Sequence, residues 1–389
     1  MIVLFLSPAF PPTAADFCAA LAARGVTVLG IGDEPLRPDS REARALTDYV
    51  FEPRMAEYVV LRDVVASLQH KHGRIDRIDS NGEHWLVTEA RLRDDFHVVG
   101  LSRAAVERRR SKLQMGPLFA QAGIRYPETV SCADATAVRH MAKTRGFPLV
   151  CKPEAGSGAV ATFTIDNHGD LESALERELR SHIVQPFIAG DIITYDGLAD
   201  RAGQIVFSTS HVYDTGIMQV RQGRRDGHYY SLRELPPGLE DVGRRAVAAF
   251  DIRERFFHVE FFQQQDGFVA LEMNLRPPGG FTTDMMNAAC DIDIYALWAS
   301  VMTGDELAGF RFERKYHTAH AGRRAGNHYR LSPEELRQRL GGTLLRERPI
   351  PPAFAETMGD MAYLLRHTDL DELKAAIGLV QQRKEPAAE

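Results

Sequence analysis

The sequence predicts an α/β protein that begins with a parallel, doubly wound layer. Residues 1–100 alternate strand and helix patterns, an order typical of parallel sheets covered by helices. Hydrophobic residues make up 44% and charged residues 26% of the chain, as in a globular protein. The length of 389 residues is sufficient for two or three domains.

The first hundred residues supply this layer element by element. The opening stretch "MIVLFLSPAFPP" lacks the basic start of a signal peptide, and its apolar run is too short for one, so a buried first strand is predicted. Asn81 and Glu83 lie at a strand-to-helix turn, where such sheets often bind ligands, although a helix start also uses these residue types. The predicted strands are "IVLFLS", "VTVLGIG", the weaker "RIDRIDS" and a short "HVVGL", and the predicted helices are "TAADFCAALAARG", "VVLRDVVASLQHKHG" and the end of "SNGEHWLVTEARLRDDF".

The rest of the chain mixes strands and helices less regularly. A helix over residues 104–122 carries the basic run "RRRSK", which usually forms a solvated face. Past Asp305 the chain becomes arginine-rich and less periodic, with helices expected near "SPEELRQRLG" and "DLDELKAAIGL". The other predicted elements are the strands in "FPLVCKPEAGSGAVATFTID", "HIVQPFIAGDIITYDGLAD" and "QIVFSTSHVYD", and the helices "GDLESALERELR" and "LEDVGRRAVAAFDI".

Charge and cysteine content narrow the function classes. The net charge of -6 argues against a nucleic-acid partner, which usually requires a basic surface. No apolar run reaches membrane-spanning length, so no membrane partner is expected. The four cysteines are scattered without a metal-type spacing, which favours reduced thiols and a cytoplasmic protein.

The stretch "RFFHVEFFQQQDGFVALEMNLRP" predicts two strands with a polar face. Glu272, Asn274 and Arg276 alternate with apolar residues and therefore share one face. A three-residue loop, residues 265–267, would place Glu260 opposite Glu272, whereas a two-residue turn at 266–267 would separate them. The loop with glycine at its last position is the better prediction, and it brings the two carboxylates within reach of one ion.

Two facing carboxylates and an amide predict a site for a hard cation, Mg²⁺ or Mn²⁺. Mg²⁺ usually combines one or two carboxylates with substrate phosphates, so the predicted metal ligands are Glu260, Glu272 and Asn274 beneath a phosphate chain. Arg276 would clamp an anion at the end of this face. The competing interpretation, a solvated polar face, is weaker because the flanking phenylalanines imply burial.

Two further stretches contain groups suited to a nucleotide. Lys152 ends an apolar strand and precedes the small-residue loop Gly156, Ser157 and Gly158, whose backbone N–H groups can approach phosphate closely. This is not a Walker A loop, and an ordinary hairpin turn is the alternative. Strands bent at Gly190 would expose backbone groups near Gln185, Phe187 and Ile188, and Asp191 could accept from ribose, although a hairpin with a packed aromatic explains the stretch equally well.

In this order, the motifs resemble the ATP-grasp superfamily of carboxylate–amine ligases over roughly residues 103–304. The motifs "HVEFF" and "EMNLRPPGG" are similar to its paired metal-ligand motifs, and "SKLQMGPLFAQAGIRYPET" is similar to its first lysine segment, which implies that Lys112 binds nucleotide phosphate. The second lysine and the phosphate loop of the superfamily resemble "FPLVCKPEAGSGAVATF", and its adenine hinge resembles "IVQPFIAGDIITYDG". Gln185 stands where the hinge usually has an acid, and Asp191 stands where the ribose-binding residue is usually glutamate. The resemblance implies a pre-ATP-grasp domain at 1–103, a small lobe at 104–182 and a large lobe with a C-terminal extension at 183–389.

The resemblance also implies a reaction. ATP, with Mg²⁺ or Mn²⁺, would phosphorylate a carboxylate to an acyl phosphate, and an amine would displace the phosphate. Lys112 and Lys152 would neutralise phosphate oxygens, and Arg276 would hold the carboxylate or the departing phosphoryl group. A bicarbonate-activating enzyme of the carboxylase or carbamoyl-phosphate type is the alternative within enzymes, and a nucleotide-binding sensor that has lost catalysis is the alternative outside them.

The substrates are less readable from the sequence. An amino acid or small peptide is predicted, since an α-carboxylate suits arginines and an ammonium group suits acids. A homodimer is left open. The candidate contacts, each also explained by a surface or helix-capping role, are His211, Tyr213, Arg221, Arg224, Arg225, Thr282, Thr283, Asp284, Arg323 and Arg324.

Overall fold

The computed structural model describes residues 1–156, 161–177, 179–213, 226–305 and 307–384. Ser157 and Gly158 of the predicted phosphate loop, and the predicted contacts Arg221, Arg224 and Arg225, lie outside these ranges. Within them, the chain forms a four-stranded parallel sheet, a four-stranded antiparallel sheet and a nine-stranded sheet between the two. No helix in the described ranges is long and apolar enough to cross a membrane.

The N-terminal sheet has the strand order β3-β2-β1-β4 and is parallel throughout, as predicted. Successive residues of β1 are buried on opposite faces: Val3 and Phe5 pack with α1 and α12, and Leu4 and Leu6 pack with α3 and α4. An apolar run such as "IVLFL" is the pattern of a parallel strand covered on both sides. The elements are β1 (Ile2–Leu6), α1 (Ala14–Ala22), β2 (Thr27–Gly32), α2 (Arg41–Arg44), β3 (Asp48–Phe51), α3 (Tyr58–His72), β4 (Arg77–Asp79) and α4 (Leu86–Phe96).

Three details of this layer differ from the prediction. The short helix α2 and the half-exposed edge strand β3 were not predicted, and the predicted strand "HVVGL" is wrong, because residues 97–101 form a turn and bends. At the β4 edge, where a further strand would pair, the Arg93 guanidinium donates to the Ile78 carbonyl oxygen at 2.7 Å. A side chain therefore satisfies a backbone carbonyl at this edge of the sheet.

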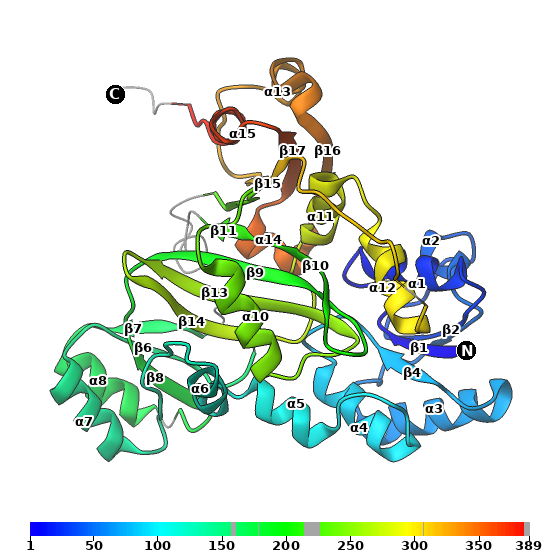
Figure 1. The fold of residues 1–389 in the computed structure, drawn as a ribbon, viewed down its shortest axis with the longest axis horizontal. Coiled ribbons are helices and arrows are strands. Elements are labelled where there is room, and N and C mark those ends of the chain that lie inside the picture. The colour runs from blue at the N-terminus through cyan, green and yellow to red at the C-terminus, as the bar shows by residue number, and fades with distance from the viewer. Residues whose placement is uncertain (157–160, 178, 214–225, 306, 385–389) are drawn as a thin grey trace.

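The small antiparallel sheet has the order β5-β8-β6-β7 and is covered by α7 and α8, at the lower left of Figure 1. The predicted helix over 104–122 is two helices that meet at Ser111, whose hydroxyl accepts from the Gln114 N–H at 3.3 Å and so begins the second one. The elements are α5 (Arg103–Arg110), α6 (Lys112–Gln121), β5 (Val130–Ser131), α7 (Ala135–Arg145), β6 (Leu149–Pro153), β7 (Phe163–Ile165), α8 (His168–Glu176) and β8 (His182–Pro186).

The large sheet runs in the order β14-β13-β9-β11-β12-β15-β17-β16, with β10 also paired to β9. Its β9, β13 and β14 pack against α6 and α10. The single strand predicted for "QIVFSTSHVYD" is divided into two strands, β10 and β11, which both pair with β9. The elements are β9 (Asp191–Ala199), β10 (Ile205–Thr209), β11 (His211–Tyr213), β12 (His228–Ser231), α10 (Leu239–Ala249), β13 (Arg255–Gln264), β14 (Gly267–Asn274), α11 (Thr282–Cys290) and α12 (Ile294–Thr303).

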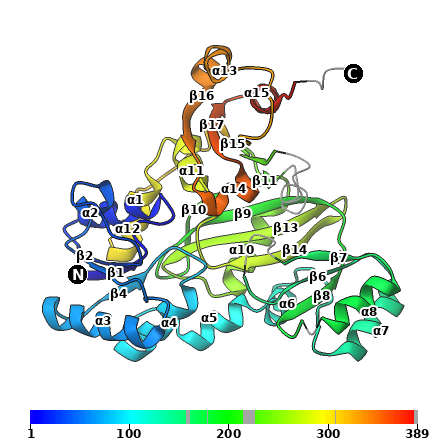
Figure 2. The same ribbon diagram turned by 180° about the vertical axis from the view of Figure 1, so that it is seen from behind.

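The arginine-rich C-terminal part contains strands that were not predicted. The strands β15 and β17 are central in their part of the large sheet, and α13 and α15 cover them in the upper part of Figure 2. The sequence of β15, "HTAHAGR", has few of the β-branched and aromatic residues that mark strands. The elements are β15 (His317–Arg323), α13 (Pro333–Leu340), a short 3₁₀ turn (Gly341–Thr343), β16 (Leu344–Pro349), α14 (Pro352–Met358), β17 (Met361–His367) and α15 (Leu370–Gln381).

Candidate active site

Strands β13 and β14 bring the predicted polar residues together. His258 lies opposite Asn274, and Glu260 lies opposite Glu272, as predicted. The predicted three-residue loop is wrong, however, because Gln264 pairs with Gly267 and leaves a two-residue turn. The register shifts between Glu260 and Phe261, and the extra residue in β14 restores the pairing of the two glutamates. A β-bulge therefore places both carboxylates on one face of the sheet.

Each glutamate has a cationic or hydrogen-bonding partner. The Lys112 Nζ is 2.9 Å from the Glu272 Oε2, and the Asn274 side-chain amide donates to the Glu272 Oε1 at 3.1 Å. Burial alone would raise the pKa of Glu272, but the charges of Lys112 and Lys152 lower it to about 2. The Glu260 Oε1 lies 2.9 Å from the His258 Nε2. The surroundings of Glu272 thus favour its ionised form.

A buried network that the sequence did not predict lies behind Glu260. The Asp196 carboxylate is 2.6 Å from the His258 Nδ1 and 2.7 Å from the His211 Nδ1. Burial alone would lower the pKa of His258, but Asp196 and Glu260 raise it to about 9. Asp196 faces His258 because β9 pairs with β13 in this register. His211, a predicted substrate contact, is instead fully buried beside Asp196.

The two predicted phosphate lysines approach the same carboxylate from different elements. Lys112 begins α6 and is buried, and its Nζ donates to the Gly156 carbonyl oxygen at 3.0 Å, so it is not part of a solvated basic face. Lys152 is buried in β6. Burial lowers the pKa of Lys152 to about 8, with the charge of Lys112 acting in the same direction and those of Glu272 and Glu260 against it.

This lowered pKa predicts an alkaline limit to nucleotide binding. A protonated lysine attracts phosphate, and the charge of Lys152 is lost as the pH rises through about 8. We expect kcat/KM for ATP to fall above pH 8 in the wild type, and the fall to be absent in Lys152→Arg, which stays charged. Steady-state kinetics from pH 6 to 10 measure this, with the exposed Lys143→Arg as the matched control. An identical alkaline limb in Lys152→Arg would contradict the assignment.

The predicted adenine-binding stretch joins the two antiparallel sheets. Its strands β8 and β9 lie in different sheets, so the alternative of an ordinary hairpin is wrong. Gly190 turns the chain between them with φ +154°, and a Cβ there would lie 2.7 Å from the Gln263 carbonyl oxygen. Gln185 is buried, and its side-chain amide donates a hydrogen bond to the Thr129 Oγ1 at 2.8 Å. Phe187 is 50% exposed, so it is not the packed aromatic of the alternative. Ile188 is half-buried and Asp191 is exposed at the start of β9.

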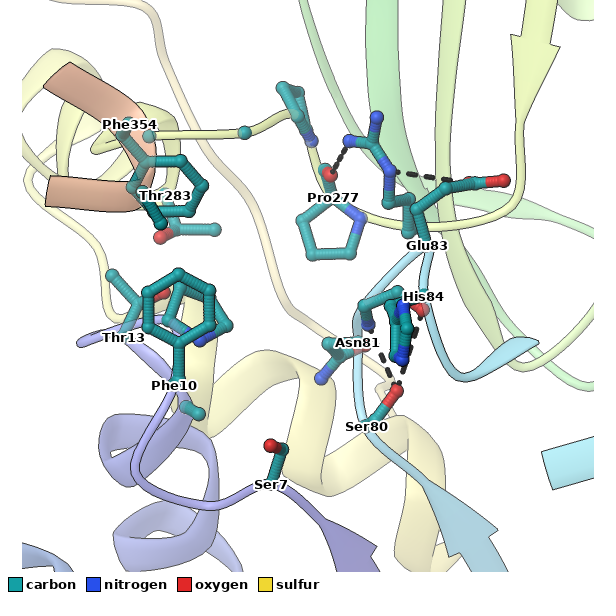
Figure 3. Close-up of a pocket in the computed structure, with 18 of the residues that line it drawn as sticks. Ser7, Phe10, Thr13, Ser80, Asn81, Glu83, His84, Pro277, Thr283 and Phe354 are labelled. Carbon is teal, nitrogen blue, oxygen red and sulfur yellow. Dashed lines mark hydrogen bonds and ion pairs between the residues drawn. The ribbon is translucent and has the colours of Figure 1, made fainter. Parts of the chain in front are cut away.

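Arg276 connects the strand pair to the N-terminal layer. Its Nε lies 3.4 Å from the Glu83 Oε2, and its Nη1 donates to the Pro277 carbonyl oxygen at 2.8 Å. Glu83 also accepts from the Arg110 Nε at 2.7 Å. The strand-to-helix turn that carries Asn81 and Glu83 therefore faces the end of β14, as Figure 3 shows for Glu83 and Pro277.

Asn81, Glu83 and Arg276 line a cavity of about 690 Å³, whose lining does not include Glu272 or the two lysines. This volume lies within the range of about 300–1,000 Å³ that is typical of small-molecule sites. Glu260, His258 and Arg276 form one part of the wall. The remainder comes from the carboxyl edge of the N-terminal sheet (residues 7–14, 32–34 and 80–85), from the loop 277–280, and from C-terminal residues that include His320, Phe354 and Met358.

The fold matches solved structures along almost the whole chain. An L-amino acid ligase from Bacillus licheniformis superposes with a TM-score of 0.75 at 17% identity, covering 97% of this chain and 96% of that one. An N5-carboxyaminoimidazole synthetase from Staphylococcus aureus, complexed with ADP, gives a TM-score of 0.72 at 13% identity, with 97% and 96% covered. The chain has the ATP-grasp fold.

Curated sequences match this ATP-grasp chain less completely. The large chain of carbamoyl phosphate synthase from Rubrobacter xylanophilus is 22% identical over 71% of the chain, and an L-arginine-specific L-amino acid ligase from Bacillus subtilis is 25% identical over 59%. The matches span only 27% and 57% of the lengths of these two relatives. No protein-family model matches the chain.

The donor set of the ATP-grasp chain fits the predicted hard cation. Within the described ranges, no three or more His, Cys, Asp or Glu side chains form a metal-binding group by themselves. Two carboxylates and an amide are instead the incomplete set that Mg²⁺ completes with phosphate oxygens and water. Glu260, Glu272 and Asn274 would hold the ion, which would supply positive charge to the phosphate chain when bound.

The remaining predicted contacts separate into two groups. Tyr213 and Thr283 line the cavity, with the Thr283 hydroxyl 2.9 Å from the Tyr295 hydroxyl. The other four have structural contacts. Thr282 contacts the Gly279 carbonyl, and Asp284 contacts Arg348. Arg323 contacts the Val380 carbonyl, and Arg324 contacts the Glu356 carbonyl. The described cysteines are all free, although Cys132 and Cys151, far apart in sequence, bring their sulfurs to 3.6 Å.

Proposed function

We propose that the protein is an ATP-dependent ligase that activates a carboxylate as an acyl phosphate and joins it to an amine. The proposal rests above all on the facing pair Glu260 and Glu272 with Lys112 and Lys152 beside them. Carboxylates with buried lysines suit a metal–triphosphate chain, and phosphoryl transfer needs mainly positioning and charge neutralisation. The likeness to an L-amino acid ligase supports an amino acid or small peptide as substrate.

The proposed roles follow from the positions of the residues. Glu260, Glu272 and Asn274 would hold the divalent ion, and Lys112 and Lys152 would contact the phosphates together with the backbone of the loop at Gly156. Gln185, Phe187, Ile188 and Asp191 would contact the nucleoside. Arg276 lines the cavity next to this face, so it would hold the carboxylate or the phosphoryl group that leaves.

The test is amino-acid-dependent ADP release. Purified protein is incubated with ATP, Mg²⁺ and pairs of amino acids, and ADP and the condensed products are measured by a coupled assay and mass spectrometry. We expect one molecule of ADP per amide bond formed, with activity abolished by EDTA and restored by Mg²⁺ or Mn²⁺. Turnover that persists without divalent metal, or ADP release that no carboxylate–amine pair stimulates, would refute the proposal.

The likeness to carbamoyl phosphate synthase supports a second candidate, activation of bicarbonate. The same assay separates the two candidates when it includes bicarbonate without amino acids. ADP release that depends on bicarbonate, in CO₂-depleted buffer, would favour the second candidate.

A further inference from the structure

The cavity beside Arg276 has two chemically different ends. Figure 3 shows Glu83, His84 and Asn81 on one side and Phe10, Thr13, Thr283 and Phe354 on the other. The first side carries the ion pair of Glu83 and Arg276 and adjoins Glu260. On the second side, Phe10 and Phe354 stack with ring centroids 5.1 Å apart and their planes at 28°.

The stacked pair joins distant parts of the chain. Phe10 follows β1 in the N-terminal layer, and Phe354 belongs to α14. Phe10 is 40% exposed, so much of its ring surface contacts water in the free protein. Met358, one turn further along α14, adds an adaptable apolar side chain to the same wall.

A ligand that covers this wall gains by removing apolar surface from water. An apolar group is therefore favoured there, and a charged group would lose hydration without a charged partner. The acids Asp33 and Glu34 also line the cavity, but both are exposed at the edge of the sheet, where water screens them. The end at Arg276 has the opposite preference, because its guanidinium is a charged partner for a carboxylate. A metal ion held by Glu260 would add positive charge there.

We propose that the cavity binds an amino acid with an uncharged, apolar side chain, and that Phe10 and Phe354 determine this specificity. The proposal rests on the ligase function proposed above, which it narrows to a substrate class. The carboxylate of the ligand lies toward Arg276 and the metal face, and its side chain lies against the two rings. The cavity and the ligand each have one polar and one apolar end, so only one orientation of the ligand matches both ends of the cavity.

Kinetics of ring-deletion variants test this specificity. We expect wild-type kcat/KM to be at least tenfold higher for leucine, methionine or phenylalanine than for aspartate, lysine or glycine in the same position. Phe354→Ala should lower kcat/KM for leucine and methionine about tenfold or more and leave that for glycine within about twofold. Phe354→Tyr, which keeps the ring, should retain the wild-type order.

Two controls keep the test decisive. Phe51→Ala removes another exposed ring, 48% exposed and outside the cavity, and should leave the selectivity unchanged. Phe10→Ala removes the other ring of the stacked pair, which lies in the N-terminal layer. It should reproduce the effect of Phe354→Ala. If Phe354→Ala fails to fold, as judged by circular dichroism, Phe10→Ala alone decides.

Binding measured without ATP separates failure of this inference from failure of the ligase proposal. Saturation-transfer NMR with the free enzyme should detect leucine or phenylalanine but not aspartate or lysine, and the signal should fall in Phe354→Ala. Selective binding without ADP release would refute the ligase function and leave the apolar specificity standing. ADP release that is equal or greater with lysine or aspartate would refute the specificity and leave the ligase standing.

Discussion

Replacing Glu272 by glutamine is expected to lower ATP-dependent turnover by about 10³-fold while the protein stays folded. Glutamine keeps the shape of the side chain but removes the charge that would bind the metal ion. The substitution also leaves Lys112, whose Nζ lies 2.9 Å from the Glu272 Oε2, without its anionic partner. We expect a stability loss of about 1–3 kcal/mol, which a native domain tolerates.

The measurement is ADP release over a range of Mg²⁺ concentrations, with thermal unfolding as the check on folding. The matched control is Glu240→Gln, because Glu240 is an exposed glutamate on α10 that pairs with Arg244. This control should retain wild-type turnover. If Glu272→Gln kept more than about a tenth of wild-type activity at saturating Mg²⁺, Glu272 would not be a metal ligand.

Replacing Arg93 by alanine is expected to lower the free energy of unfolding by about 3–5 kcal/mol. Arg93 is buried, with its Nη1 3.4 Å from the Glu89 Oε2, and it also donates to the Ile78 and Leu101 carbonyl oxygens. Its removal takes from the fully buried Glu89 its nearest cationic partner, and only the weaker influence of Arg255 remains. The turn at residues 80–85 then loses support, because Glu89 accepts a hydrogen bond from the Ser80 hydroxyl.

The pH dependence of this loss is a second readout. Burial, with the charge of Asp79, already raises the pKa of Glu89 to about 7 in the presence of Arg93, and loss of the arginine raises it further. When folding raises the pKa of a carboxyl group, the folded state loses stability as the pH rises from the pKa of the unfolded state to the pKa of the folded state. The stability deficit of Arg93→Ala should therefore be larger at pH 8 than at pH 5.

A matched pair on α5 provides the control. Arg103 and Glu107 have the same spacing of four residues and a distance of 2.7 Å, but both side chains are about half exposed. Arg103→Ala should leave the free energy of unfolding almost unchanged, because water screens this exposed pair. Urea unfolding of both variants measures the difference, and equal losses would show that burial does not determine the strength of the Arg93–Glu89 pair.

Local patterns were sufficient to predict much of this architecture. The alternation in "EMNLR" identified the polar face of β14, and the pairing of Glu260 with Glu272 is confirmed. The sequence did not reveal that a bulge, and not the turn, sets this register, because both routes give the same alternation. The local pattern also predicted the parallel N-terminal layer, whose central strand β1 is short and continuously apolar.

Contacts between distant segments were not predictable in this way. Asp196 stands out as a polar residue in an apolar strand, but only the pairing of β9 with β13 places it against His258. The strands β15 and β17 have weak local propensity and are stabilised by their neighbours in the sheet. Phe10 and Phe354 meet because the fold brings α14 to the loop that follows β1, which no short stretch of sequence encodes.

The placement of α14 has a consequence for biosynthesis. Both glutamates and both lysines are translated before this helix, so a nascent chain can assemble its phosphate-handling groups while the chamber beside them still lacks its outer wall. In that interval any activated acyl group would meet bulk water. Under the ligase function proposed above, the late-translated helix would shield the acyl phosphate from water, and loss of this wall would favour ATP hydrolysis over amide-bond formation.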